Sequence, residues 1–158
     1  MLELTQAVFV FLFAVFIGSF LNVCIYRMGR EQSIIAPASH CPSCKHPIRW
    51  HDNIPLISYV LLRGRCRDCH KPISLRYFLV ELLTGVLFLM LYHRFGLSVP
   101  FFVFAVFVCG LIIATFVDVD FQIIPDEVSV GGLVVGLAAS VIFPQVQHMP
   151  THLLGLRA

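Results

Sequence analysis

The chain has 158 residues, of which 58% are hydrophobic and 13% are charged, and its mean hydropathy is +0.87. This composition is too apolar for a soluble domain of this length and favours a polytopic membrane protein. The net charge is only +2, but nine of the eleven Lys and Arg residues fall within residues 27–76. Such a loop could contact nucleic acid, but the positive-inside rule explains it more simply. We therefore expect membrane lipid and no nucleic acid as a partner, and we place the loop in the cytoplasm.

The first apolar run covers residues 7–26 and contains no charged residue. It is long enough to cross a bilayer, and it lacks the basic start and the small-residue cleavage site of a secretory signal. We interpret residues 1–26 as transmembrane helix 1, with the N-terminus outside. Gly18, Ser19 and Asn22 lie within about one helical turn and predict close helix packing and an interhelical hydrogen bond. A direct role in chemistry is the alternative for these three residues.

The hydrophilic loop of residues 27–76 contains two C-x2-C pairs separated by 21 residues. Two such pairs can complete the tetrahedral thiolate site of a structural zinc ion. Two disulfides are the rival interpretation, but they need an oxidising compartment, which the cytoplasmic placement argues against. A redox-active pair is a third, less supported by the pattern because no βαβ signal surrounds it. The predicted ligands are Cys41, Cys44, Cys66 and Cys69.

Residues 52–63, between the two pairs, are mostly apolar, and we expect a short helix at the membrane surface there. Transmembrane helix 2 is predicted over residues 77–92. It carries Glu81 one turn from its start, and an intramembrane carboxylate is a functional-site hypothesis. The alternative is that Glu81 pairs with Arg76 or with backbone donors at the helix start.

A short link over residues 95–100 predicts a hairpin that leads into transmembrane helix 3, residues 101–117. Three aspartates, Asp118, Asp120 and Asp126, then arrive on the cytoplasmic side, with no Lys or Arg between Arg94 and Arg157 to neutralise them. They either form a functional site or cap two helix ends in the headgroup region. At about 100° per residue, Asp118 and Asp120 face opposite ways on a helix, so a carboxylate partner for Asp118 should come from elsewhere.

Residues 128–143 are rich in Gly and Ala and predict a fourth, closely packed helix. The predicted fold is an all-α polytopic membrane protein of about four transmembrane helices. Its zinc-binding loop lies between helices 1 and 2, and residues 77–158 hold helices 2–4. After an external link over residues 144–150, residues 151–158 look like the start of a further segment.

Several motifs agree in order with one known family. They are the Gly-Ser-Phe-Leu-Asn-Val run of residues 18–23, the two C-x2-C pairs with Asn-Ile-Pro…Ser-Tyr (residues 53–59) between them, the Ile-Ser-x-Arg-Tyr…Glu-Leu-Leu-Thr pattern of residues 73–84, and the D-x-D…P-D pattern of residues 118–126. Over essentially the whole chain they resemble the type IV prepilin peptidases. These are aspartic peptidases of the bacterial inner membrane that serve type IV pilus and type II secretion systems.

The resemblance implies an enzyme that cleaves the basic leader of prepilins and pseudopilins at the cytoplasmic face, after Gly and before Phe. Many members then N-methylate the new N-terminus with S-adenosylmethionine. The first catalytic aspartate of the family maps onto Asp118, and the zinc ligands map onto the four cysteines. Asp120, Asp126 and Glu81 are candidates for supporting roles.

One departure concerns the second catalytic aspartate, which the family carries in a later Gly-x-Gly-Asp motif that residues 1–158 lack. We therefore expect an N-terminal part of the enzyme that is inactive alone. Two other classes stay open. One is a zinc-stapled membrane scaffold without hydrolytic activity, and the other is a proton or ion pathway through Asp118 and Glu81.

Overall fold

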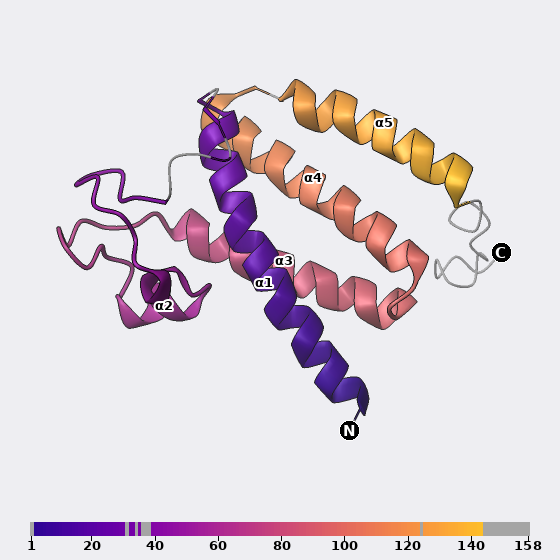
Figure 1. The fold of residues 1–158 in the computed structure, drawn as a ribbon, viewed down its shortest axis with the longest axis horizontal. Helices are drawn as coiled ribbons and strands as arrows, with labels where there is room; N and C mark the ends of the chain where they lie inside the picture. The colour runs from indigo at the N-terminus through magenta and orange to yellow at the C-terminus, as the bar shows by residue number, and fades with distance from the viewer. Residues whose placement is uncertain (1, 31, 34, 36–38, 124, 144–158) are drawn as a thin grey trace.

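The computed structural model describes residues 2–30, 32–33, 35, 39–123 and 125–143. The regular elements among the described residues are all helices, with two isolated β-bridges and no strand (Figure 1). The all-α prediction is therefore confirmed for this part of the chain. The elements are α1 (Leu2–Met28), the 3-10 helix η1 (Trp50–Asn53), α2 (Ile57–Leu61), α3 (Leu75–Phe95), α4 (Val99–Phe121) and α5 (Asp126–Ile142).

Three helices, α1, α3 and α4, are long and apolar enough to cross a membrane. This agrees with the predicted polytopic membrane protein. The predicted fourth helix also forms, as α5, but its 17 residues lie at the short end of what a spanning helix needs. A fourth crossing therefore stays a prediction, and the expected link and segment after residue 143 lie outside the described residues.

The helices extend beyond the apolar runs that predicted them. The clearest case is α4, which continues past Val117 to Phe121, so Asp118 and Asp120 occupy its last turn. The helix ends at Gln122, whose left-handed backbone (φ 56°) lets its N–H donate to the Asp118 carbonyl at 2.8 Å. Asp118 and Asp120 therefore belong to α4, and only Asp126 follows it, in α5.

The main helix crossing joins α1 to α3 at Gly18. A Cβ added to Gly18 would lie 2.8 Å from the Cα of Glu81 and 3.0 Å from the Thr84 hydroxyl oxygen, so only glycine allows this approach. One turn later the Asn22 side chain donates to the Tyr77 carbonyl at 2.9 Å. The close packing and the interhelical hydrogen bond predicted for this stretch are confirmed.

Two small apolar clusters hold α1, α3 and α4 together. One contains Val10, Ala14, Phe88, Phe101 and Ala105, and the other contains Leu21, Ile25, Val80, Ile112 and Val117. In contrast, α5 lies along α4 and has no buried residue (Figure 1). The C-terminal ends of α1 and α4 and the start of α3 gather at one end of the bundle. That end carries the loop.

Candidate functional site

The structure brings the four predicted cysteines into one cluster, which we call the cysteine cluster (Cys41, Cys44, Cys66 and Cys69). All four sulfur atoms lie within 4.8 Å of one another, and all are free thiols. The sulfur atoms of Cys41 and Cys69 are 3.9 Å apart, and those of Cys44 and Cys66 are 4.0 Å apart. A tetrahedral zinc site with Zn–S bonds of about 2.3 Å has sulfur–sulfur edges of about 3.8 Å. The cluster could therefore hold one metal ion of the size of zinc.

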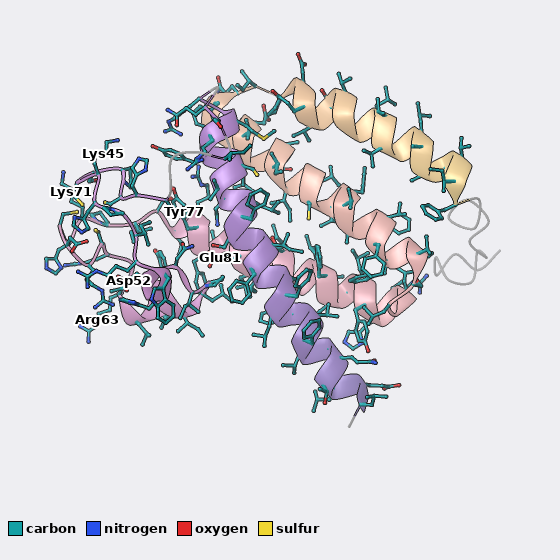
Figure 2. All side chains as sticks on the ribbon, in the orientation of Figure 1. Lys45, Asp52, Arg63, Lys71, Tyr77 and Glu81 are labelled. Atoms are coloured by element: carbon teal, nitrogen blue, oxygen red, sulfur yellow. The ribbon has the colours of Figure 1, made fainter. Side chains whose placement is uncertain are left out.

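Both halves of the cluster are built in the same way. The Cys41 amide donates to the His46 carbonyl, and the Cys66 amide donates to the Lys71 carbonyl, each at 2.9 Å. A residue with positive φ follows the second cysteine of each pair, Lys45 at 61° and His70 at 56°. β-bridges then close the two turns, from His40 to Pro47 and from Arg65 to Pro72. These turns aim two sulfurs inward from each half, while the labelled Lys45 and Lys71 lie at the outer edge of the loop (Figure 2).

The thiols of the cysteine cluster differ in acidity. Burial raises the pKa of Cys41, but hydrogen bonds from the amides of Cys44 and Ser43 outweigh it and lower that pKa to about 7. At Cys44 the His46 amide lowers the pKa, whereas desolvation and the neighbouring thiols raise it, for a net value of about 11. Such unequal proton affinities are typical of thiols packed together, and a bound cation would favour the thiolate at every ligand.

Glu81 fastens the loop to the helices. Its carboxyl is buried and accepts a hydrogen bond of 2.7 Å from the Leu56 amide, with the Ser19 side chain as a further hydrogen-bond partner. Leu56 has a positive φ of 60°, which is rare for a leucine and costs energy unless its surroundings hold it. Glu81 therefore does pair with a backbone donor, but the donor belongs to the loop and not to the start of its own helix.

A cavity of about 490 Å³ lies between the C-terminal half of α1, the start of α3 and the loop. Its lining includes Ser19, Asn22, Tyr26, Arg30 and Glu81. Asn22 is only 2% exposed, and no described residue bonds to its side-chain oxygen. Ser19 and Asn22, for which the sequence predicts a packing role, therefore also line this cavity.

The three aspartates have separate surroundings. Asp118 is exposed in the last turn of α4, and no described residue forms a hydrogen bond or ion pair with its carboxylate. Asp120 forms an ion pair with Arg76 at the start of α3. Asp126 is exposed in the first turn of α5, where the helix dipole favours a negative charge. The structure therefore does not pair Asp118 with a second carboxylate within the described residues.

The contacts of two basic residues at the site were not predicted from the sequence, which offered Arg76 only as a possible partner of Glu81. Arg76 supplies the counter-charge for Asp120, and the Arg30 guanidinium lies 4.0 Å from the ring centre of Tyr26 and 5.0 Å from that of Phe121. Both join the end of α4 to other helices. The only sequence signal was their position at the loop borders, where the positive-inside rule already explained them.

Comparisons with known proteins agree with this arrangement. The family model described as "Bacterial Peptidase A24 N-terminal domain" matches residues 12–95, which is more than half of the chain. This range contains most of α1, the whole cysteine cluster and α3. No solved structure matches the chain.

The curated relatives are all named as enzymes that process the leader peptides of prepilins or prepilin-like proteins. The chain is 47% identical over 132 residues to "Prepilin leader peptidase/N-methyltransferase" of Myxococcus xanthus (strain DK1622), covering 84% of this chain and 39% of the relative. It is 38% identical to the protein of the same name in Klebsiella pneumoniae, with coverages of 85% and 63%. It is 41% identical to "Type 4 prepilin-like proteins leader peptide-processing enzyme" of Escherichia coli O78:H11 (strain H10407 / ETEC), with coverages of 78% and 53%.

The chain therefore spans about half the length of the curated relatives it matches. The match over residues 12–95 shows that the chain belongs to the bacterial peptidase A24 N-terminal domain family, which confirms the prepilin-peptidase resemblance of its sequence.

Proposed function

We propose that this chain is the N-terminal part of a prepilin leader peptidase of the bacterial inner membrane. The enzyme would cleave the basic leader of prepilins or pseudopilins at the cytoplasmic face, after Gly and before Phe. The observation that carries the proposal is 47% identity over 132 residues to a protein named prepilin leader peptidase/N-methyltransferase. The bundle end that carries Asp118, the cysteine cluster and the basic loop is then the cytoplasmic end.

Asp118 is the residue we propose as one of two catalytic carboxylates. Two close carboxylates can share one proton, so that one activates a water while the other donates a hydrogen bond. Asp118 suits this role because it is exposed and is not neutralised by a described cation. Asp120 is a poor partner because Arg76 already compensates its charge.

The second carboxylate is proposed to come from outside residues 1–158, in the Gly-x-Gly-Asp motif that the family resemblance implies. Asp126 and Glu81 are weaker candidates. Asp126 lies beyond Pro125 on a different helix, and Glu81 is already bonded to the loop. We accordingly expect residues 1–158 alone to leave prepilin uncleaved.

The metal is proposed to be one structural Zn²⁺ bound by Cys41, Cys44, Cys66 and Cys69. Four thiolates close the coordination sphere, so the ion would stabilise the loop and would take no direct part in peptide hydrolysis. N-methylation with S-adenosylmethionine is proposed as a second activity. It rests on the names of the relatives and on the family resemblance, and we assign no residue to it.

A scaffold without hydrolytic activity is the second candidate. It is favoured by one observation: the described residues assemble a complete cysteine cluster but only a single free carboxylate at the end of α4. The two candidates differ in what Asp118 does, so the experiment below separates them.

The test uses the full-length protein in detergent and a prepilin-like substrate with a basic leader and a Gly–Phe junction. Leader release is read by mass spectrometry for the parent, Asp118→Asn, the matched control Asp120→Asn and residues 1–158 alone. We expect Asp118→Asn to lose at least about 10²-fold in rate, as removal of an acid–base group does, and Asp120→Asn to retain most activity. Cleavage by Asp118→Asn at the parental rate would refute the assignment, and no cleavage by any protein would favour the scaffold.

A further inference from the structure

We propose that the segment from Trp50 to Arg63 anchors the cysteine-bearing loop on the anionic surface of the membrane. In this arrangement the outer face of α2 enters the boundary between headgroups and acyl chains. The inference goes beyond the proposed peptidase activity and does not rest on it, because it uses only the shape, exposure and charge of the loop.

The first argument is that α2 has its apolar face outward. Ile57, Val60 and Leu61 follow the i, i+3, i+4 spacing of one helix face and are 55%, 62% and 76% exposed. Ser58, by contrast, is buried at the edge of this face and donates to the His51 carbonyl at 2.9 Å. A surface helix in water instead turns its apolar face toward the protein and its polar face outward. The orientation of α2 therefore predicts apolar surroundings.

The second argument is the depth at which α2 is held. The Leu56 amide is bonded to Glu81, which lies six residues after the first residue of α3 and therefore about 9 Å along that helix. The Tyr59 ring also contacts the Phe78 ring, with 5.5 Å between their centres. These contacts keep α2 beside the first turns of a membrane-spanning helix (Figure 1). A segment fixed at that level meets lipid.

The third argument is that the backbone of this segment is largely satisfied from within. Amides without a partner are costly near the hydrocarbon region. The Ile54 amide donates to the Ser58 hydroxyl, and the Leu56 amide to Glu81. The amides of Ser58 and Leu62 donate to carbonyls of the same segment. The segment can therefore lie in the headgroup boundary without exposing these donors.

Charge identifies the surface as anionic lipid. Arg49, Arg63 and Arg65 are exposed beside the apolar face, and Arg63 points away from the helix bundle (Figure 2). The one acid within residues 49–65 is Asp52, and Arg67 binds it at 2.5–3.0 Å. The rim is therefore positive, which attracts anionic phospholipids and opposes contact with a second copy of the same rim.

The experiment uses Trp50, which is 82% exposed and is the only tryptophan of the chain. The chain is reconstituted in phosphatidylcholine vesicles with or without phosphatidylglycerol, and with acyl chains brominated near the headgroup or left unlabelled. An indole at the membrane interface should be quenched by bromine. We expect a loss of Trp50 emission in brominated vesicles, and a larger loss when phosphatidylglycerol is present.

Variants test which residues carry the contact. Val60→Asp with Leu61→Asp should reduce the quenching, and Arg63→Glu should reduce it only in vesicles that contain phosphatidylglycerol. The matched control is Ile35→Asp, because Ile35 is a loop residue that is 94% exposed and lies outside the segment. Ile35→Asp should leave the quenching unchanged.

Equal Trp50 emission in brominated and unlabelled vesicles would overturn the proposal, and this comparison needs no substitution. Protection of Trp50 from both bromine and aqueous acrylamide would also overturn it, because a second copy or another protein would then cover the face. Zinc content of each variant is measured in parallel, so that a variant with a misfolded loop is recognised.

Discussion

The cysteine cluster and the acidic end of α4 lie at the same end of the bundle but differ in completeness. The cysteine cluster draws all four of its thiols from residues 41–69, in two equivalent turns whose sulfurs lie within 4.8 Å of one another. At the end of α4, Asp118 is exposed and has no described partner, while Asp120 is compensated by Arg76. A site made from one short loop can be complete in this chain, whereas a site made between helices depends on which other helices are present.

The largest expected effect is the loss of one cysteine. Cys41→Ser should lower the zinc content from about one ion per chain to near zero, because a structural site needs all four ligands. Structural zinc contributes about 10–16 kcal/mol to the folding of small zinc peptides, so the loop should lose its order and become sensitive to protease. Metal analysis and limited proteolysis measure both effects.

The matched control for this prediction is Cys109→Ser. Cys109 is a free thiol on α4 that packs against the helix clusters, outside the cysteine cluster. The Cys109→Ser protein should therefore keep about one zinc ion per chain. A Cys41→Ser protein with normal zinc content would show that the cluster is not the metal site, and it would remove the contrast with the end of α4.

The next effect concerns the helix crossing that supports both regions. In Gly18→Ala the new methyl group would meet the Glu81 backbone at 2.8 Å, so α1 and α3 must separate. Overpacking of this kind costs about 1–3 kcal/mol. Gly136→Ala is the control, because nothing lies within 4 Å of that position. Thermal unfolding in detergent should show a lower midpoint for Gly18→Ala than for Gly136→Ala or the parent protein. Equal midpoints would mean that α1 and α3 are not in close contact at Gly18.

Glu81→Leu tests how the loop is attached to the bundle. The change leaves the Leu56 amide without its acceptor, which costs about 1–3 kcal/mol for a buried donor. Because Leu56 holds a strained positive φ, we expect α2 to detach and its amides to exchange faster with solvent. Glu81→Gln keeps an oxygen acceptor and should restore most of the protection. Hydrogen exchange that is unchanged in Glu81→Leu would contradict this attachment.

The parts of the molecule that could be predicted from the sequence are those determined by residues close together in the chain. Apolar runs gave α1, α3 and α4, and the cysteine spacing gave the cluster, because each depends on residues close in sequence. The end of α4 was predicted four residues early, because the uninterrupted apolar run stops at Val117 while the helix stops only at Gln122, where the backbone turns left-handed. The contacts of Leu56 with Glu81 and of Arg76 with Asp120 join residues that are distant in sequence, so a local hydrophobic pattern could not predict them.

The smallest expected effect is the pH response of Asp52, whose hydrogen bond from exposed Arg67 holds its pKa below the ordinary value of about 3.9. A folded-state pKa that is depressed adds stability above the unfolded pKa and loses it as pH falls through the folded pKa. We expect carboxyl NMR to show a titration midpoint below about 3.9, which Arg67→Ala raises. A metal ion held by the cysteine cluster would be lost in acid, because protons compete with it for the thiolates. A low titration midpoint for Asp52 therefore requires that the contacts with Glu81 and Phe78 keep the Trp50–Arg63 segment in place without metal. An ordinary midpoint that Arg67→Ala does not change would mean that the metal alone orders this segment.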